Sequence, residues 1–401
     1  PEFAVYNGLP GRRGELDDYS PEGLAARNDL DRSILRELDG VEAADDVDRV
    51  TVAAMRERLG VGLDLADAGE DLRSLNNIDS PVQTLRDGFD NLPTATEEDW
   101  ADFASALRAV PRALDQYAHS LRLARSRGDI AARRQVGAAI SQARDQAGEA
   151  TSSYTALIDG AATADGAPLP PALAAELREA AAVARRGYAR LADFLAEEIL
   201  PEAGRADAVG RERYERFSRE FLGAVVDLDE TYEWGRERLA AIDAEQRAIA
   251  ERLYGPGTGV REAMDRLNAD PARTVHGTAA LRDWMQQTSD RAMAALDGVH
   301  FDIPAPLRTL ECRIAPSATG GIYYTGPSDD FSRPGRMWWS VPAGTEDFAT
   351  WQERTTVFHE GVPGHHLQVG MQTWLRDELN SWRRLACWVS GHGEGWALYA
   401  E

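Results

Sequence analysis

The sequence predicts a mainly α-helical protein with a small antiparallel β element near its C-terminal end. Residues 171–200 carry leucine, alanine and tyrosine side chains mostly at three- and four-residue steps, which gives a helix one apolar face. After residue 300 the pattern changes, because proline and glycine recur at close intervals. Two short runs rich in aromatic and β-branched residues, 322–324 and 337–341, are typical of strands joined by a turn-rich connection.

Capping residues and glycines set the expected limits of the other helices. Ser20 before a proline, and the capping-box spacing that begins at Thr96, mark two helix starts, and Asp129 is expected to cap a third. Gly60 is expected to end one helix and Gly235 to break another. The expected helices cover 21–38, 45–59, 96–127, 129–157, 208–254, 259–268 and 272–297.

The chain divides into three regions by the character of these elements. Residues 1–160 form an N-terminal helical region, 161–300 a region of long helices, and 301–401 the β element with the helices of a candidate site. No internal repeat or low-complexity linker separates the regions, so one continuous fold is expected. Residues 394–401 end inside an expected helix, which leaves the C-terminal limit of the fold open.

Composition excludes several classes of function. The net charge of −23 gives a surface that repels nucleic-acid phosphates, so no nucleic-acid partner is expected. No apolar stretch is long enough to span a membrane. The chain contains no lysine, which excludes Schiff-base and pyridoxal phosphate chemistry and the phosphate-loop lysine. The cysteines, Cys312 and Cys387, are too few for a disulfide framework and favour the cytoplasm.

Candidate catalytic residues are concentrated near the end of the chain. Four of the seven histidines lie at or after residue 359, and His359 is followed directly by Glu360. A catalytic zinc ion takes three protein ligands from histidine and carboxylate and leaves a position for water. The usual helical pattern, His-Glu-x-x-His, puts two histidines one turn apart. Here the fourth residue after His359 is Pro363, which has no ligand atom.

Two later histidines compete for the second ligand position. In a straight helix His366 would lie about 10 Å from His359 along the axis, too far for both to bind one ion. Proline followed by glycine at 363–364 breaks the helix and lets the chain loop out. Looping out two residues would bring His365 into position, and looping out three would bring His366. We favour His365.

Glu394 is the expected third ligand, because it lies in a glycine-rich segment that should form the next helix. His392 and Glu401 lie in the same segment. We expect these two residues to contact the metal ligands, without binding the metal themselves, and to orient a histidine ring by hydrogen bonding. Together with the two histidines, Glu394 predicts a site for Zn²⁺.

Two segments of this region resemble a known family. His-Glu-Gly-Val-Pro-Gly-His-His-Leu-Gln (359–368) and Glu-Gly-Trp-Ala-Leu-Tyr-Ala-Glu (394–401) resemble the signature segments of the bacterial domain-of-unknown-function 885 family, which is grouped with the gluzincin-type zincin metallopeptidases. Further segments that are similar to this family are 8–10, 17–21, 320–324 and 333–335. The resemblance therefore covers most of the chain.

The resemblance implies a large helical, zincin-like peptidase fold with a deep cleft and the β element beside the metal. It implies zinc, with Glu360 as general base, and a peptide or small peptide-like substrate that is cleaved in the manner of a carboxypeptidase or an oligopeptidase. By analogy, the two strands would line the cleft and pair with an extended peptide. Tyr323 or Tyr324 would donate to the developing oxyanion, and Arg336 would bind a substrate carboxylate.

Two alternatives use the same residues. Pro363, in place of a ligand, is compatible with a catalytically inactive helical scaffold that binds a partner. A metal-dependent hydrolase of a non-peptide substrate would need the same site.

Overall fold

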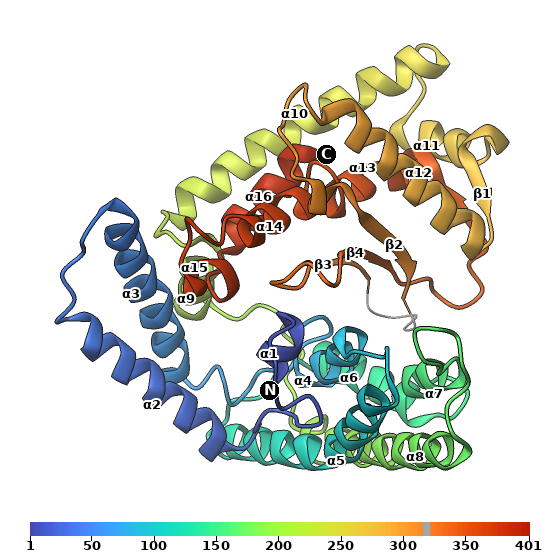
Figure 1. The fold of residues 1–401 in the computed structure, drawn as a ribbon. Helices are drawn as coiled ribbons and strands as arrows, with labels where there is room; N and C mark the ends of the chain where they lie inside the picture. Colours follow the sequence, from blue (N-terminus) through green and yellow to red (C-terminus); the bar gives the residue numbers. More distant parts are fainter. Residues whose placement is uncertain (316–320) are drawn as a thin grey trace.

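The computed structural model describes residues 1–315 and 321–401, so Gly320 of the resemblance lies outside the described residues. The chain is mainly helical, as predicted (Figure 1). The helices are α1 (Glu2–Tyr6), α2 (Pro21–Leu38), α3 (Asp46–Asp67), α4 (Pro81–Asp87), α5 (Glu97–Ser126), α6 (Arg133–Ala147), α7 (Ser153–Asp159), α8 (Pro171–Phe194), α9 (Arg211–Leu222), α10 (Leu228–Tyr254), α11 (Val260–Asn268), α12 (Thr278–Leu296), α13 (Thr350–Glu360), α14 (His365–Trp374), α15 (Ser381–Leu385) and α16 (Ser390–Ala400). Short helical turns are η1 (Gly88–Asn91), η2 (Leu195–Ile199), η3 (Pro271–Arg273) and η4 (Ala305–Arg308).

No helix among the described residues combines the length and apolar character needed to cross a membrane.

The largest hydrophobic core lies among α4 to α8. Helices α5 and α8 run side by side along the base of the molecule in Figure 1 and bury one face of each against the other. Leu107, Leu177 and Tyr188 are almost fully buried there, and the Tyr188 hydroxyl donates to the carbonyl of Val82 at 3.1 Å. Helix α8 follows the predicted boundary at residue 160, yet it belongs to the same core as α5. That boundary therefore marks a change of element within one core.

A three-stranded sheet lies above this helical layer in the view of Figure 1. Its order is β2-β4-β3, with β3 antiparallel and β2 parallel to β4. The strands are β1 (Thr274–His276), β2 (Leu310–Ile314), β3 (Ile322–Thr325), β4 (Gly335–Trp339) and β5 (Asp347–Ala349), and β1 pairs antiparallel with β5. The antiparallel β3–β4 pair confirms the predicted β element. Strand β2 was missed, because its alternating charged and apolar residues span only five positions.

The two faces of the sheet meet different layers. Cys312, Met337 and Trp339 point into a second core that α12 and α13 complete. On the other face the Tyr323 hydroxyl donates to Asp90 of η1 at 2.9 Å. Asp90 is also paired with the buried Arg86 of α4. The sheet is thus fixed between the N-terminal helices and the helices that follow it.

Two predicted helix breaks were wrong. Helix α3 continues through Gly60 to Asp67, and α10 continues through Gly235. A glycine inside a helix costs only about 1 kcal/mol relative to alanine, so it does not by itself end one. The break occurs instead at Gly223, where φ is +67° and the left-handed backbone closes α9.

The predicted cap at Asp129 was also wrong. Helix α6 begins after Ala132, whereas the Asp129 carboxylate accepts a hydrogen bond from Arg73 at 2.6 Å. The predicted tract 129–157 also divides at Gly148, before α7. By contrast, the capping box at Thr96 and the start of α2 after Ser20 are confirmed.

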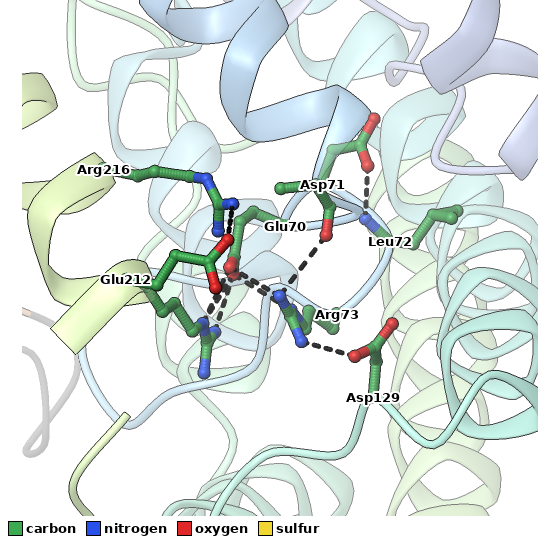
Figure 2. A network of polar contacts seen from close by, with 9 residues as sticks. Glu70, Asp71, Leu72, Arg73, Asp129, Glu212 and Arg216 are labelled. Carbon is green, nitrogen blue, oxygen red and sulfur yellow. Dashed lines mark hydrogen bonds and ion pairs between the residues drawn. The ribbon is translucent and has the colours of Figure 1, made fainter. Parts of the chain in front are cut away.

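A buried carboxylate ties α9 to the end of α3. Glu70 accepts hydrogen bonds from Arg73 at 2.6 Å and from Arg213 of α9 at 2.7 Å, and Arg73 also holds Asp129 (Figure 2). Burial raises the pKa of Glu70, but the hydrogen bonds from Arg213 and Arg73 outweigh it, and the net pKa lies below its ordinary value. Helix α9 in turn contacts α16, so this network supports one helix of the candidate site.

We expect Glu70→Ala to lower the free energy of unfolding by about 3–5 kcal/mol, because it leaves the partly buried guanidinium of Arg213 without its carboxylate partner and leaves Arg73 with Asp129 alone. The pKa of Glu70 is depressed in the folded state, so its contribution is present above its unfolded pKa and is lost as the pH falls through the folded pKa. The difference in free energy of unfolding between wild type and Glu70→Ala, measured with a denaturant, should therefore become smaller at acidic pH. Glu212→Ala, which removes an exposed partner of Arg216, is the control and should cost less than about 1 kcal/mol. Equal losses in the two variants would contradict this role of Glu70.

Candidate metal centre

Three helices bring one side chain each to a common point. They are His359 near the end of α13, His365 at the start of α14 and Glu394 in α16. One ligand atom from each lies within 4.8 Å of the other two. The Oε2 atom of Glu394 is 3.2 Å from His359 Nε2 and 3.6 Å from His365 Nε2.

The turn between α13 and α14 makes this approach possible. Helix α13 ends at Glu360, the Val362–Pro363 peptide is cis, and α14 begins at His365. The backbone N–H of Gly364 donates to the carbonyl of Phe358 at 3.0 Å, so the chain folds back onto the end of α13. A Cβ at Gly364 would lie 1.9 Å from the carbonyl oxygen of His359, so only glycine fits there.

The Nδ1 atom of each of the two histidines faces an oxygen of another side chain. His359 Nδ1 is 3.0 Å from Glu401 Oε1, and His365 Nδ1 is 3.2 Å from Gln368 Oε1. Each oxygen can accept a hydrogen bond from the Nδ1–H of its ring, and in that tautomer Nε2 carries the lone pair. Both Nε2 lone pairs then face the carboxylate oxygen of Glu394. In that tautomer three electron-rich atoms converge, and a cation between them would relieve their mutual repulsion.

The two separations that involve Glu394 are close to those around a tetrahedral ion. Ligand bonds of about 2.0–2.1 Å at tetrahedral angles place the ligand atoms roughly 3.3 Å apart. The two distances to Glu394 Oε2, 3.2 and 3.6 Å, lie on either side of that value. Two imidazoles and one carboxylate also leave a fourth position open, as catalytic zinc sites do. The residues present therefore fit a metal of the zinc type.

Glu360 lies beside this cluster without joining it. Its side chain is buried and borders the same cavity as the three ligands. Burial, together with the carboxylates of Glu394 and Glu401, raises the pKa of Glu360 to about 8. A bound cation would favour the ionised carboxylate and lower this pKa. Glu360 thus brings a carboxyl group with a raised pKa to the wall of the cavity that His359, His365 and Glu394 also line.

A cavity of about 810 Å³ opens in front of the cluster. Strand β3 is an edge of the sheet and forms part of its wall, and α14 forms another part. Its lining also includes Tyr6 and Asn7 next to α1, Arg384 and Leu385 of α15, and Trp388. A volume of this size is typical of cavities that bind small organic ligands or short peptides.

Comparison with known proteins assigns the chain to a family. Residues 1–401 match the family described as bacterial protein of unknown function, DUF885. The chain belongs to this family. A search of curated proteins finds no match.

Two crystal structures are similar to this DUF885 chain in fold. One is titled a "putative lipoprotein from Colwellia psychrerythraea"; it is 19% identical, with a TM-score of 0.81, and the match covers 100% of this chain and 73% of that chain. The other is titled a "putative lipoprotein of unknown function from Shewanella oneidensis", at 15% identity and a TM-score of 0.62, with the same coverage. At these identities the likeness concerns the fold alone.

His366 lies outside the cluster in the DUF885 chain. It is buried, its Nε2–H donates to the carbonyl of Leu307 at 2.8 Å, and its Nδ1 accepts from the Tyr324 hydroxyl at 3.0 Å. Burial lowers the pKa of His366 to about 4, so the ring is neutral. Both ring nitrogens are thus used inside the protein, and the geometry favours His365 as the second ligand.

The other predicted site residues lie at different distances from the cluster. Glu401 contacts the ring of His359, as expected, whereas His392 offers only its backbone carbonyl, which accepts from Gln368. Tyr323 and Tyr324 both line the cavity. Their hydroxyls donate to Asp90 and His366, so an oxyanion role would require one of these hydrogen bonds to break.

Arg336 is not brought to the metal cluster. It borders a separate cavity on the face of the sheet that meets the N-terminal helices, and its Nε donates to Glu311 at 2.9 Å. The sequence analysis selected neither Gln368 nor Arg384 as a site residue. Gln368 could have been found, because it is one turn after His365 on the same helix. Arg384 reaches the cavity only through the fold of α15.

We expect His365→Ala and His366→Phe to separate metal binding from stability. His365→Ala removes a proposed ligand, so it should weaken Zn²⁺ binding by more than about a hundredfold. The melting temperature of the metal-free His365→Ala protein should be nearly that of the metal-free wild type. Loss of the His366 hydrogen bonds should cost about 1–3 kcal/mol for each buried partner left unsatisfied, with stoichiometric zinc retained. Calorimetric titration with Zn²⁺ and thermal unfolding measure the two effects. Retention of zinc by His365→Ala but not by His366→Phe would reverse the assignment.

Proposed function

We propose that this DUF885 protein is a zinc-dependent metallopeptidase that hydrolyses peptide or peptide-like amide bonds. The observation that carries the proposal is that one potential ligand atom from each of His359, His365 and Glu394 lies within 4.8 Å of the other two. An open ligand position, a buried carboxylate beside it and a cavity in front of it provide the other requirements of a metal-assisted hydrolase.

Each residue of the cluster has a distinct part. Zinc, when bound, would polarise the substrate carbonyl and lower the pKa of a water molecule towards neutrality. Glu360 would accept the proton from that water and pass it to the leaving amine. Glu401 and Gln368 hold the two imidazoles in the tautomer that leaves Nε2 free.

The cavity favours an extended, peptide-like substrate. Strand β3 lines the cavity, and among the described strands only β4 pairs with it, so one of its backbone edges is available for pairing. An extended peptide can add to such an edge through main-chain hydrogen bonds. Tyr6, Tyr323 and Trp388 supply apolar area for side chains. These features support a carboxypeptidase or oligopeptidase type of activity.

The alternatives make different demands on the site. The inactive-scaffold hypothesis rested on Pro363 in place of a ligand, but the turn at Pro363 returns His365 to that place. A hydrolase of a non-peptide substrate would use the same cluster. It would not need the edge strand, so a panel of peptides, esters and other amides separates it from a peptidase.

The location of the protein is a separate question. The two free cysteines favour the cytoplasm, whereas two structurally similar proteins are each described as a putative lipoprotein, which favours a lipid-anchored protein. Cell fractionation of the producing organism distinguishes these two proposals.

We expect Glu360→Gln to keep the zinc and lose the activity. The amide cannot accept the water proton, so the rate of amide hydrolysis should fall by about 10²–10⁴-fold. Elemental analysis and peptide hydrolysis on the same preparation measure both properties.

The matched variant is Glu394→Ala, which removes a ligand and should lose both zinc and activity. Amide hydrolysis that persists in zinc-loaded Glu360→Gln would contradict the proposed role of Glu360. Absence of zinc from the wild-type protein after zinc is supplied would favour the scaffold alternative.

A further inference from the structure

A second cavity, of about 650 Å³, lies between the sheet and the N-terminal helices. Strands β2 and β4 form one wall, with Arg313 and Arg336 among their side chains, and α12 adds Arg282. The described residues that line this cavity and the metal cavity have no member in common. Among the described lining residues the arginines outnumber the acidic ones, Asp90 and Glu311, although the whole chain carries a net charge of −23.

The acidic groups of this second cavity are already paired and leave positive charge in excess. Asp90 accepts two hydrogen bonds from Arg86, at 2.7 and 3.0 Å. Glu311 is shared, because its Oε2 accepts from Arg336 Nε at 2.9 Å and lies 3.6 Å from Arg313 Nε. Burial lowers the pKa of Arg313, and the positive charge of Arg336 lowers it further. One carboxylate therefore serves two guanidinium groups that repel each other.

Arg336 keeps donors that a ligand in the cavity can reach. Its Nη1 and Nη2 make no hydrogen bond with the described residues, and neither atom is fully enclosed by protein. Strand β4 is the central strand of the sheet and the N-terminal helices cover this face, so the cavity is the open space next to the Arg336 side chain. Because that side chain is 19% exposed, its terminal nitrogens are accessible from the cavity.

The wall opposite the sheet is apolar. Leu92, Trp100 and Leu157 line it, directly after η1, from α5 and from α7. On the sheet side, the guanidinium of Arg313 lies over the ring of Trp338, with 5.4 Å between its Cζ and the ring centroid. A ligand in this space would therefore contact guanidinium groups on one side and apolar side chains on the other.

We propose that this cavity binds a small anion with a flat apolar body, such as a carboxylate or a phosphate ester on an aromatic ring, and that Arg336 donates to the anionic group with Arg313 beside it. A guanidinium with free N–H groups binds such an oxyanion through parallel hydrogen bonds. The anion would also relieve the repulsion between the two arginines, and the apolar wall would cover the ring. This site is separate from the proposed metal centre and does not require the protein to be a peptidase.

Four probes separate the parts of the proposal: 2-naphthoate, its neutral analogue 2-naphthamide, 2-naphthyl phosphate and inorganic phosphate. Isothermal titration with the metal-free protein measures their binding without any contribution from zinc. We expect 2-naphthoate to bind about 10–100-fold more tightly than 2-naphthamide, the range typical of a charge-assisted hydrogen-bonded contact. 2-Naphthyl phosphate should bind at least about tenfold more tightly than inorganic phosphate, because its ring buries apolar surface. The tighter of the two naphthyl anions identifies the preferred anionic group.

Variants of the sheet wall test where the probes bind. Arg336→Gln should lower the ratio of 2-naphthoate to 2-naphthamide affinity to below about threefold, because it removes the donors. Glu311→Gln should raise the affinity for 2-naphthoate by about three- to tenfold, because it removes the carboxylate that competes for the same guanidinium groups. Arg308→Gln is the matched control: this arginine also pairs through Nε with one carboxylate, that of Asp297 at 2.8 Å, but lines neither cavity. It should keep the wild-type ratio.

Thermal unfolding shows whether each variant is folded. If Arg336→Gln does not fold, Glu311→Gln still decides, since a purely structural ion pair gives no gain in anion affinity when its carboxylate is removed. Equal binding of 2-naphthoate and 2-naphthamide by the wild type would overturn the proposal, as would an unchanged ratio in folded Arg336→Gln. None of these results depends on zinc or on hydrolysis, so failure of this proposal and failure of the peptidase proposal are distinguished.

Discussion

The return of the chain between α13 and α14 is the constraint on which the candidate site depends. A continuous helix could not bring a second histidine to His359, because the nearest later ones are six and seven residues away. The turn at 361–364 removes that separation, and it fits only because Gly364 has no side chain to meet the backbone of His359. Every other element of the site is arranged around this turn.

The surrounding structure holds the turn from several sides. His366 is fixed in the interior by Leu307 and Tyr324, which leaves His365 to face His359. The sheet stands between the N-terminal helices and the site helices, since Tyr323 is bound to Asp90 on one face while the opposite face completes the core of α12 and α13. Helix α9, anchored through Glu70, packs against α16 and so supports Glu394. The cluster is therefore built on elements that are separately restrained.

Local signals in the sequence predicted much of this arrangement. The mainly helical class, the antiparallel strand pair and the capping box at Thr96 all arise from short-range patterns, and the structure confirms them. The breaks at Gly60 and Gly235 were wrong, because a glycine costs a helix only about 1 kcal/mol relative to alanine, which the rest of a long helix can offset. Whether Arg336 and Arg384 line the metal cavity depends on where each strand or helix lies in the fold. The spacing of residues along the chain does not predict which cavity a side chain borders.

The central claim is that one metal ion joins His359, His365 and Glu394. Anomalous diffraction at the zinc absorption edge, from crystals of the zinc-loaded protein, tests it most directly. The account predicts a single strong peak within about 2.0–2.2 Å of both Nε2 atoms and of a Glu394 oxygen. A peak that is coordinated by His366, or no peak between these three side chains, would contradict it.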